Sequence, residues 1–285
     1  MPITEDLSQR FIFDESDIRG DIVQITNSYR DMVARHEYPP IVQQLLGQFV
    51  VAGLLLGSTI KFKGRLILQV RSQGQIPLLM VEISHSNTFR GIARIQEQVD
   101  SEDFGDLFES GTLVVTVDPD QGKRYQSVVP LDGGSLASCL MHYFSQSEQL
   151  QTWLMLTSDD IGAAGFLLQQ LPKQLVKSDK DRERDWQHVK ILGESLKIEE
   201  LRTLSVEQIL IRLYHGQPVR VMSQKQVAYQ CTCTKARMAS ALVSLGDGEL
   251  NDLFKNTGEV ELTCEFCNQQ YSFDRAALDE AAENH

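Results

Sequence analysis

Four cysteines near the C-terminal end of the chain constrain its fold more than any other sequence feature. They form two close pairs, Cys231-Thr232-Cys233 and Cys264-Glu265-Phe266-Cys267, which are separated by the thirty residues 234–263. Four cysteine thiolates are a common ligand set for one tetrahedral zinc ion. We therefore predict a zinc site formed by Cys231, Cys233, Cys264 and Cys267, with one ion per chain in the reduced state.

The zone around these cysteines, residues 229–285, is too short to bury much apolar surface. Between the two pairs the sequence has room for helices at 234–245 and 249–255 and for a returning strand at 259–263. Structural zinc contributes about 10–16 kcal/mol of binding free energy in small zinc peptides, which exceeds the whole stability of many domains. We expect this small zinc domain to fold only with its metal.

The spacing of the cysteines also favours a redox role over an inert zinc knuckle. The first pair has one intervening residue instead of two, and the spacer exceeds the usual length of about 15–20 residues. Four thiolates around Zn²⁺ leave a net negative charge, so the cluster attracts peroxide or hypochlorous acid, which convert thiols into disulfides. A disulfide across a single residue is strained and easily reduced, as a reversible sensor requires.

The first 175 residues mix strand and helix patterns and predict a mixed α/β domain. The apolar residues of 39–60 cover nearly the whole circumference of a helix, so this helix should be buried on all sides. A second helix is expected at 135–145. Alternation and turn residues predict strands at 18–25, 64–70, 78–83, 91–96, 113–117 and 126–131.

Residues 176–228 have a different character and predict a helical linker. The run from Lys177 to Asp185 is too charged to bury and marks the boundary. Ser205 and Gln208 form a capping box ahead of a second apolar group. Apolar residues recur at helical spacing and form one stripe, which we expect the zinc domain to cover: Trp186, Val189, Leu192, Ile209, Leu210 and Leu213.

Charge and hydropathy exclude several classes of protein. The chain has 27 basic and 39 acidic side chains, a net charge of −12, which disfavours binding to nucleic acid. The strongest apolar stretch, 49–56, is shorter than the roughly 18–20 residues that cross a bilayer, so no membrane contact is expected. The acidic start lacks the features of a signal peptide. We therefore expect a cytoplasmic protein with reduced thiols.

No enzyme signature is found, neither a phosphate-binding loop, a His-Glu-x-x-His motif nor a Gly-x-Ser-x-Gly elbow. We expect a protein that is not an enzyme and does not use ATP. Two alternatives stay open: a thiol-disulfide oxidoreductase that uses Cys264 and Cys267, and a zinc-ribbon module of nucleic-acid machinery. The fifth cysteine, Cys139, lies on the apolar face of the predicted helix at 135–145 and is expected to be structural.

The cysteine spacing resembles the 33 kDa chaperonin family of redox-regulated bacterial heat-shock proteins. Further segments resemble family segments in the same order: Asp17-Ile18-Arg19-Gly20, Arg90-Gly91-Ile92-Ala93-Arg94, Tyr143-Phe144 with Ser147-Glu148-Gln149-Leu150, Arg212-Leu213-Tyr214-His215 and Tyr271-Ser272-Phe273. The resemblance covers essentially the whole chain. It implies an α+β fold in which the long buried helix lies between sheet layers, followed by the helical linker and the four-cysteine zinc domain.

The resemblance also implies a function. Such a chaperone is ATP-independent and inactive while reduced and zinc-bound. Oxidation forms disulfides Cys231–Cys233 and Cys264–Cys267, releases zinc and unfolds the linker. The exposed apolar surface then holds unfolding client proteins against aggregation under oxidative and heat stress, and the active form is a homodimer.

Overall fold

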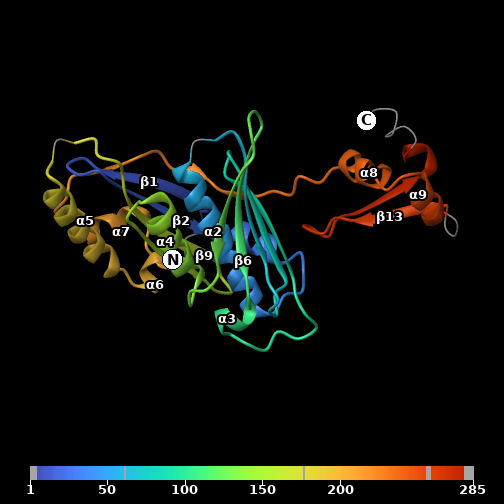
Figure 1. Cartoon of the computed structure of the whole chain (residues 1–285), viewed down its shortest axis with the longest axis horizontal. Coiled ribbons are helices and arrows are strands. Elements are labelled where there is room, and N and C mark those ends of the chain that lie inside the picture. Colours follow the sequence, from blue (N-terminus) through green and yellow to red (C-terminus); the bar gives the residue numbers. More distant parts are fainter. Residues whose placement is uncertain (1–4, 61, 176, 255–257, 279–285) are drawn as a thin grey trace. The chain divides into compact units, whose positions relative to one another are not determined.

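The computed structural model describes residues 5–60, 62–175, 177–254 and 258–278 of the chain (Figure 1). By their internal contacts the residues form two compact units, Met1–Tyr229 and Gln230–His285. The first unit holds two six-stranded sheets, and the second holds a two-stranded sheet. The mixed α+β class predicted from the sequence is confirmed.

The first sheet has the strand order β10-β1-β2-β9-β8, with β11 also paired to β1, and all its pairs are antiparallel. Of these strands, the sequence patterns predicted only β2. The strands are β1 (Leu7–Phe13), β2 (Ile18–Ile25), β8 (Thr152–Ser158), β9 (Ala163–Gln170), β10 (Val219–Val221) and β11 (Lys225–Gln226).

The second sheet has the order β12-β5-β4-β3-β6-β7 and is antiparallel except for the parallel pair of β12 with β5. Its strands are β3 (Gly64–Arg71), β4 (Leu78–Ser84), β5 (Thr88–Arg94), β6 (Thr112–Pro119), β7 (Tyr125–Pro130) and β12 (Ala228–Tyr229). Four of the predicted strands match β3, β4, β6 and β7. The fifth begins earlier than expected, because Asn87 adopts a left-handed conformation (φ 61°) that closes a tight turn directly before β5.

Helix α2 (Pro40–Thr59) lies between the two sheets and forms the centre of the first unit (Figure 1). One continuous core joins it to Val23 and Leu167 of the first sheet and to Leu66 and Val81 of the second. By length and composition this helix could cross a membrane, which corrects the expectation that no stretch was long enough. Since 67% of its most apolar window is buried inside the protein, α2 is a core helix.

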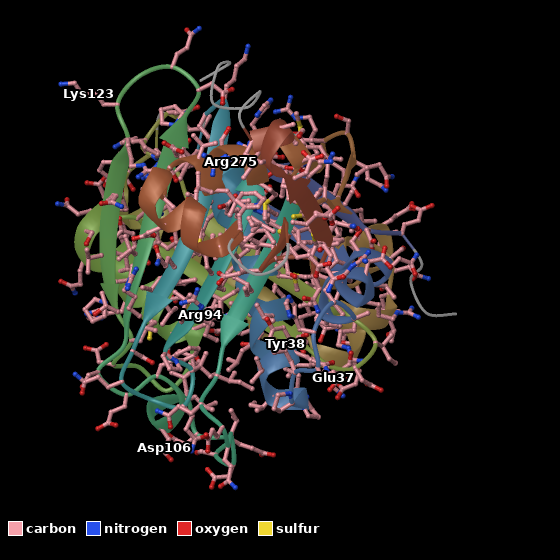
Figure 2. All side chains as sticks on the ribbon, turned by 90° about the vertical axis from the view of Figure 1, so that its right-hand side faces the viewer. Glu37, Tyr38, Arg94, Asp106, Lys123 and Arg275 are labelled. Carbon is pink, nitrogen blue, oxygen red and sulfur yellow. The ribbon has the colours of Figure 1, made fainter. Side chains whose placement is uncertain are left out.

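Three shorter helices complete this part of the first unit: α1 (Asn27–Val33), α3 (Phe104–Leu107) and α4 (Leu136–Tyr143). The predicted helix at 135–145 is α4, but after Tyr143 the chain continues as a π-helical turn, η1 (Phe144–Glu148). Figure 2 shows Asp106, on α3, and Lys123, in the turn between β6 and β7, at opposite ends of the second sheet.

The linker helices α5 (Asp179–Glu194), α6 (Ile198–Thr203) and α7 (Val206–Tyr214) pack on the first sheet, on the face opposite α2. The capping box of Ser205 and Gln208 is present at the start of α7. The apolar stripe is buried against side chains such as Phe11, Ile22 and Phe166. The expectation that the zinc domain covers this stripe is therefore wrong. Strands β2 and β9 carry buried apolar side chains on both faces, and the linker covers the face that is turned away from α2.

The second unit contains α8 (Lys235–Val243), α9 (Asp247–Phe254), β13 (Glu259–Thr263) and β14 (Gln270–Asp274). The strand predicted at 259–263 is confirmed, and both predicted helices are present, although Lys255 lies outside the described residues. Among the described residues, the buried members of this unit's apolar core are few: Ala239, Leu242, Leu250, Val260, Phe273 and Leu278. A core of this size supplies little stability by itself.

Candidate metal centre

The four cysteines of the second unit lie on two short irregular segments. Cys231 and Cys233 lie in the extended chain before α8, whose first turn is capped by the Thr234 side chain. Cys264 and Cys267 lie in the turn that joins β13 to β14. This turn is closed by two backbone hydrogen bonds, from the Cys264 N–H to the Gln269 carbonyl and from the Asn268 N–H to the Cys264 carbonyl.

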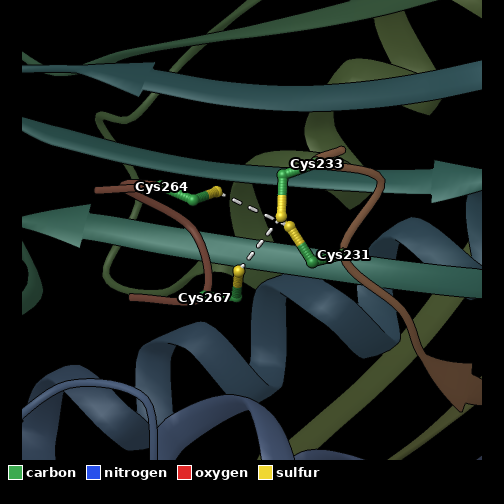
Figure 3. A group of neighbouring side chains, drawn as sticks. All are labelled: Cys231, Cys233, Cys264 and Cys267. Atoms are coloured by element: carbon green, nitrogen blue, oxygen red, sulfur yellow. Dashed lines mark hydrogen bonds between the residues drawn. The ribbon is translucent and has the colours of Figure 1, made fainter. Parts of the chain in front are cut away.

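All four Sγ atoms point toward one another and lie within 4.8 Å of each other (Figure 3). The closest contacts link one pair to the other: Cys231 Sγ to Cys264 Sγ is 3.7 Å, and Cys233 Sγ to Cys267 Sγ is 3.4 Å. A tetrahedral zinc ion with Zn–S bonds of about 2.3 Å separates its sulfur ligands by about 3.8 Å. The cluster therefore fits one tetrahedral ion without rearrangement of the backbone.

The surroundings of the sulfur atoms shift the pKa values of the cysteines in different directions. Burial opposes ionisation of Cys233, but hydrogen bonds from Tyr271 and from the neighbouring thiols outweigh it and lower the pKa of Cys233 to about 7. Burial raises the pKa of Cys264 and of Cys267. Without a nearby positive charge Cys233 thus ionises more readily than Cys264 or Cys267, and a divalent cation would stabilise the thiolates of these two.

Tyr271 is a neighbour of the cluster that the sequence analysis named only as part of a resembling segment. Its hydroxyl donates a hydrogen bond to Cys233 Sγ at 3.2 Å, and this bond raises the pKa of Tyr271 to about 12. Such a donor orients a sulfur ligand and spreads its negative charge. The pairing of β13 with β14 explains why Tyr271 reaches the cluster: Tyr271 lies opposite Leu262, two residues before Cys264.

Within the described residues, these four cysteines are the one group of cysteine, histidine and carboxylate side chains that could hold a metal ion. Cys139 lies apart from it in the first unit, where its side chain is buried in the core beside α2. Burial raises the pKa of the Cys139 thiol, which suits an inert structural cysteine, as predicted. His215, the last residue of the resembling segment that begins at Arg212, is the C-cap of α7 and is not part of the cluster.

The fold and the site together define a class of two-unit α+β proteins in which a cluster of four cysteines closes a small second unit. The chain belongs to the Hsp33 protein family, whose profile matches residues 6–274. Curated relatives from Pseudomonas are each named 33 kDa chaperonin. One from Pseudomonas savastanoi pv. phaseolicola is 47% identical over 272 residues, which cover 94% of this chain and 91% of the relative.

Two further comparisons agree with this family assignment. A 33 kDa chaperonin from Pseudomonas fluorescens is 46% identical over 276 residues, which cover 96% of this chain and 92% of the relative. The crystal structure of the 33 kDa chaperonin from Thermotoga maritima superposes with a TM-score of 0.82 over 98% of both chains. At 22% sequence identity that likeness concerns the fold.

Proposed function

We propose that this protein is a redox-regulated, ATP-independent chaperone of the cytoplasm that holds unfolding proteins under oxidative and heat stress. The observation that carries the proposal is the convergence of four cysteine sulfurs within 4.8 Å, in a unit whose apolar core is too small to be stable alone. Membership in a family of proteins named chaperonins supports the chaperone activity.

In the inactive state, Cys231, Cys233, Cys264 and Cys267 bind one zinc ion as thiolates. Zinc supplies the positive charge that keeps all four sulfurs ionised, and its binding provides most of the free energy that folds the second unit. The Tyr271 hydroxyl holds Cys233 in place. Two helices and a hairpin are then closed around their small core.

Activation is the oxidation of the four thiolates by peroxide. Each disulfide forms when two thiolates give two electrons to one H₂O₂, which takes up two protons from solvent and is reduced to two water molecules. Pairing within each motif, Cys231 with Cys233 and Cys264 with Cys267, follows the family resemblance, since the closest contacts in Figure 3 run between the motifs. Sulfurs in disulfides are poor zinc ligands, so the second unit loses its main source of stability.

The linker connects the unfolding of the second unit to the surface that binds clients. Its last strands, β10, β11 and β12, are only two or three residues long, and Cys231 follows Tyr229 after one residue. When the second unit unfolds, the C-terminal end of the linker is no longer fixed. The short strands and then α5–α7 separate from the first sheet, which exposes apolar side chains on both surfaces.

A surface of this kind binds the apolar segments of unfolding proteins, and it also favours association of two copies of the chain. The proposed partners are therefore non-native clients and, after oxidation, a second protomer. Neither ATP nor nucleic acid has a role in this scheme.

The proposal is tested by adding peroxide under mild heat and following three signals in one sample: zinc release, far-UV circular dichroism and suppression of client aggregation. We expect all three to change together. Equal chaperone activity in reduced and oxidised protein, or zinc release with unchanged helix content, would contradict the scheme. A thiol-disulfide oxidoreductase would instead turn over small disulfides without losing metal.

A further inference from the structure

A cavity of about 420 Å³ lies in the first unit, among the C-terminal end of α2, strands β2, β6, β7 and β9, and the α4–η1 segment. This volume is in the range of small-molecule sites, about 300–1,000 Å³. Its walls are mostly apolar side chains: Leu56, Val115, Val117, Leu140, Phe144 and Leu150. The proposed chaperone cycle makes no use of this cavity.

Among the described residues that line this cavity, Arg19 is the one cation. Its Nη2 donates to the Gln169 Oε1 at 2.5 Å, whereas its Nε is buried and has no hydrogen-bond acceptor in the described part of the chain. Asp21, whose charge acts on Arg19, makes its hydrogen bonds with Arg10 instead. Arg19 is half-buried and no carboxylate hydrogen-bonds to it within the described residues, so an anion in the cavity would supply its Nε with an acceptor.

Another part of the cavity lining comes from the π-helical turn η1. Tyr143 donates to the Glu148 Oε1 at 3.1 Å, so the acidic side chain is held at the exposed rim. Gln149 follows in a left-handed conformation (φ 54°), which directs Leu150 back to the wall. Single π-turns are rare and occur often at functional sites. Two of the segments that resemble the family, 17–20 and 143–150, thus meet at one cavity.

We propose that this cavity binds a small monocarboxylate that carries an alkyl or aryl group. The carboxylate pairs with the Arg19 guanidinium, which presents parallel N–H donors, and the apolar group lies along the walls. A phosphate dianion fits less well, because the described part of the lining offers one cation and places Glu148 at the rim.

Octanoate is a suitable probe, titrated by calorimetry into the reduced full-length protein, with acetate and 1-octanol as controls. We expect octanoate to bind at least about tenfold more tightly than either control, since a hydrogen bond to a charged group is among the stronger polar interactions. NMR shifts should concentrate at residues lining the cavity. No binding of octanoate, equal affinity for 1-octanol, or shifts located elsewhere would overturn the proposal.

Two variants and one control test the roles of Arg19 and of the apolar wall. Arg19→Gln should weaken octanoate binding about tenfold, whereas Arg124→Gln, at an arginine outside the lining, should leave it unchanged. Val115→Phe fills the cavity from the wall and should abolish binding with Arg19 intact. Near-UV circular dichroism establishes that each variant is folded. Octanoate affinity equal to that of the unmodified protein in both Arg19→Gln and Val115→Phe would refute the site.

Discussion

Individual side chains separate the roles of the five cysteines. Four of them lie together in the second unit, and Cys139 is buried in the core of the first unit beside α2. Burial alone does not distinguish them, since Cys264 is as buried as Cys139. The difference is that Cys264 has three other sulfurs around it, so that a cation can compensate the cost of its ionisation.

Replacing one ligand should therefore have a much larger effect than replacing the buried thiol. We expect Cys267→Ser to lose stoichiometric zinc and to unfold the second unit, because three sulfurs close the site poorly. Cys139→Ser should keep one zinc per chain and lose about 1–2 kcal/mol of stability through its buried hydroxyl. Metal analysis and far-UV circular dichroism measure both effects, and zinc retention by Cys267→Ser would contradict the ligand assignment.

Tyr271 provides a second test at the scale of one atom. Tyr271→Phe keeps the ring on the hairpin and removes the hydroxyl that donates to Cys233 Sγ. Loss of such an outer contact lowers metal affinity by about 10–100-fold. Competition with a chromogenic chelator measures this change, and Ser272→Ala, on the same strand, is the control. Unchanged affinity in Tyr271→Phe would mean that the hydrogen bond does not hold the ligand.

At the scale of elements, the linker is fixed to the first unit by polar contacts as well as by its apolar stripe. Asp17 accepts hydrogen bonds from the backbone of Gln174 and Leu175 and forms a buried ion pair with Arg182 of α5. Gln24 donates to the carbonyls of Leu201 and Leu204 at the end of α6. These contacts require the helices to be docked, so their strength sets how readily the linker is released.

Arg182→Gln should loosen the linker without touching the metal centre. Breaking a buried ion pair costs about 3–5 kcal/mol, and the remaining backbone donors to Asp17 place the expected loss near 3 kcal/mol. Arg184→Gln is the matched control on the same helix: its side chain is 71% exposed, and its loss should change stability by less than about 0.5 kcal/mol. Hydrogen exchange of the α5 amides measures both, and equal exchange in the two variants would contradict this role.

At the scale of the whole molecule, the two units have separate cores and different sources of stability. The first unit buries α2 between two sheets, with the linker helices on the outer face. The second has a small core and a cluster of cysteines. Packing thus accounts for the stability of the first unit, and we expect the second unit to depend on a bound metal ion.

Removal of the metal under reducing conditions should therefore unfold one unit before the other. With a strong chelator we expect loss of hydrogen-exchange protection in α8, α9, β13 and β14, while α2 and the strands around it stay protected. Addition of zinc should restore the protected state. Cooperative loss of both units, or full protection of the second unit without metal, would show that the units do not differ in this way.

The sequence by itself determined the features that depend on local spacing. The two cysteine motifs, the helix that is apolar on all sides, the capping box at Ser205 and the strand at 259–263 are each encoded within a few neighbouring residues, so their patterns could be interpreted directly. The tertiary structure alone decided which surfaces meet. An apolar stripe indicates that something covers the linker, but only the fold shows that β1, β2 and β9 do so. Likewise, Arg19 and Tyr143 line one cavity, and Tyr271 reaches Cys233. These contacts join residues that are distant in sequence, so the periodicity of neighbouring residues could not predict them.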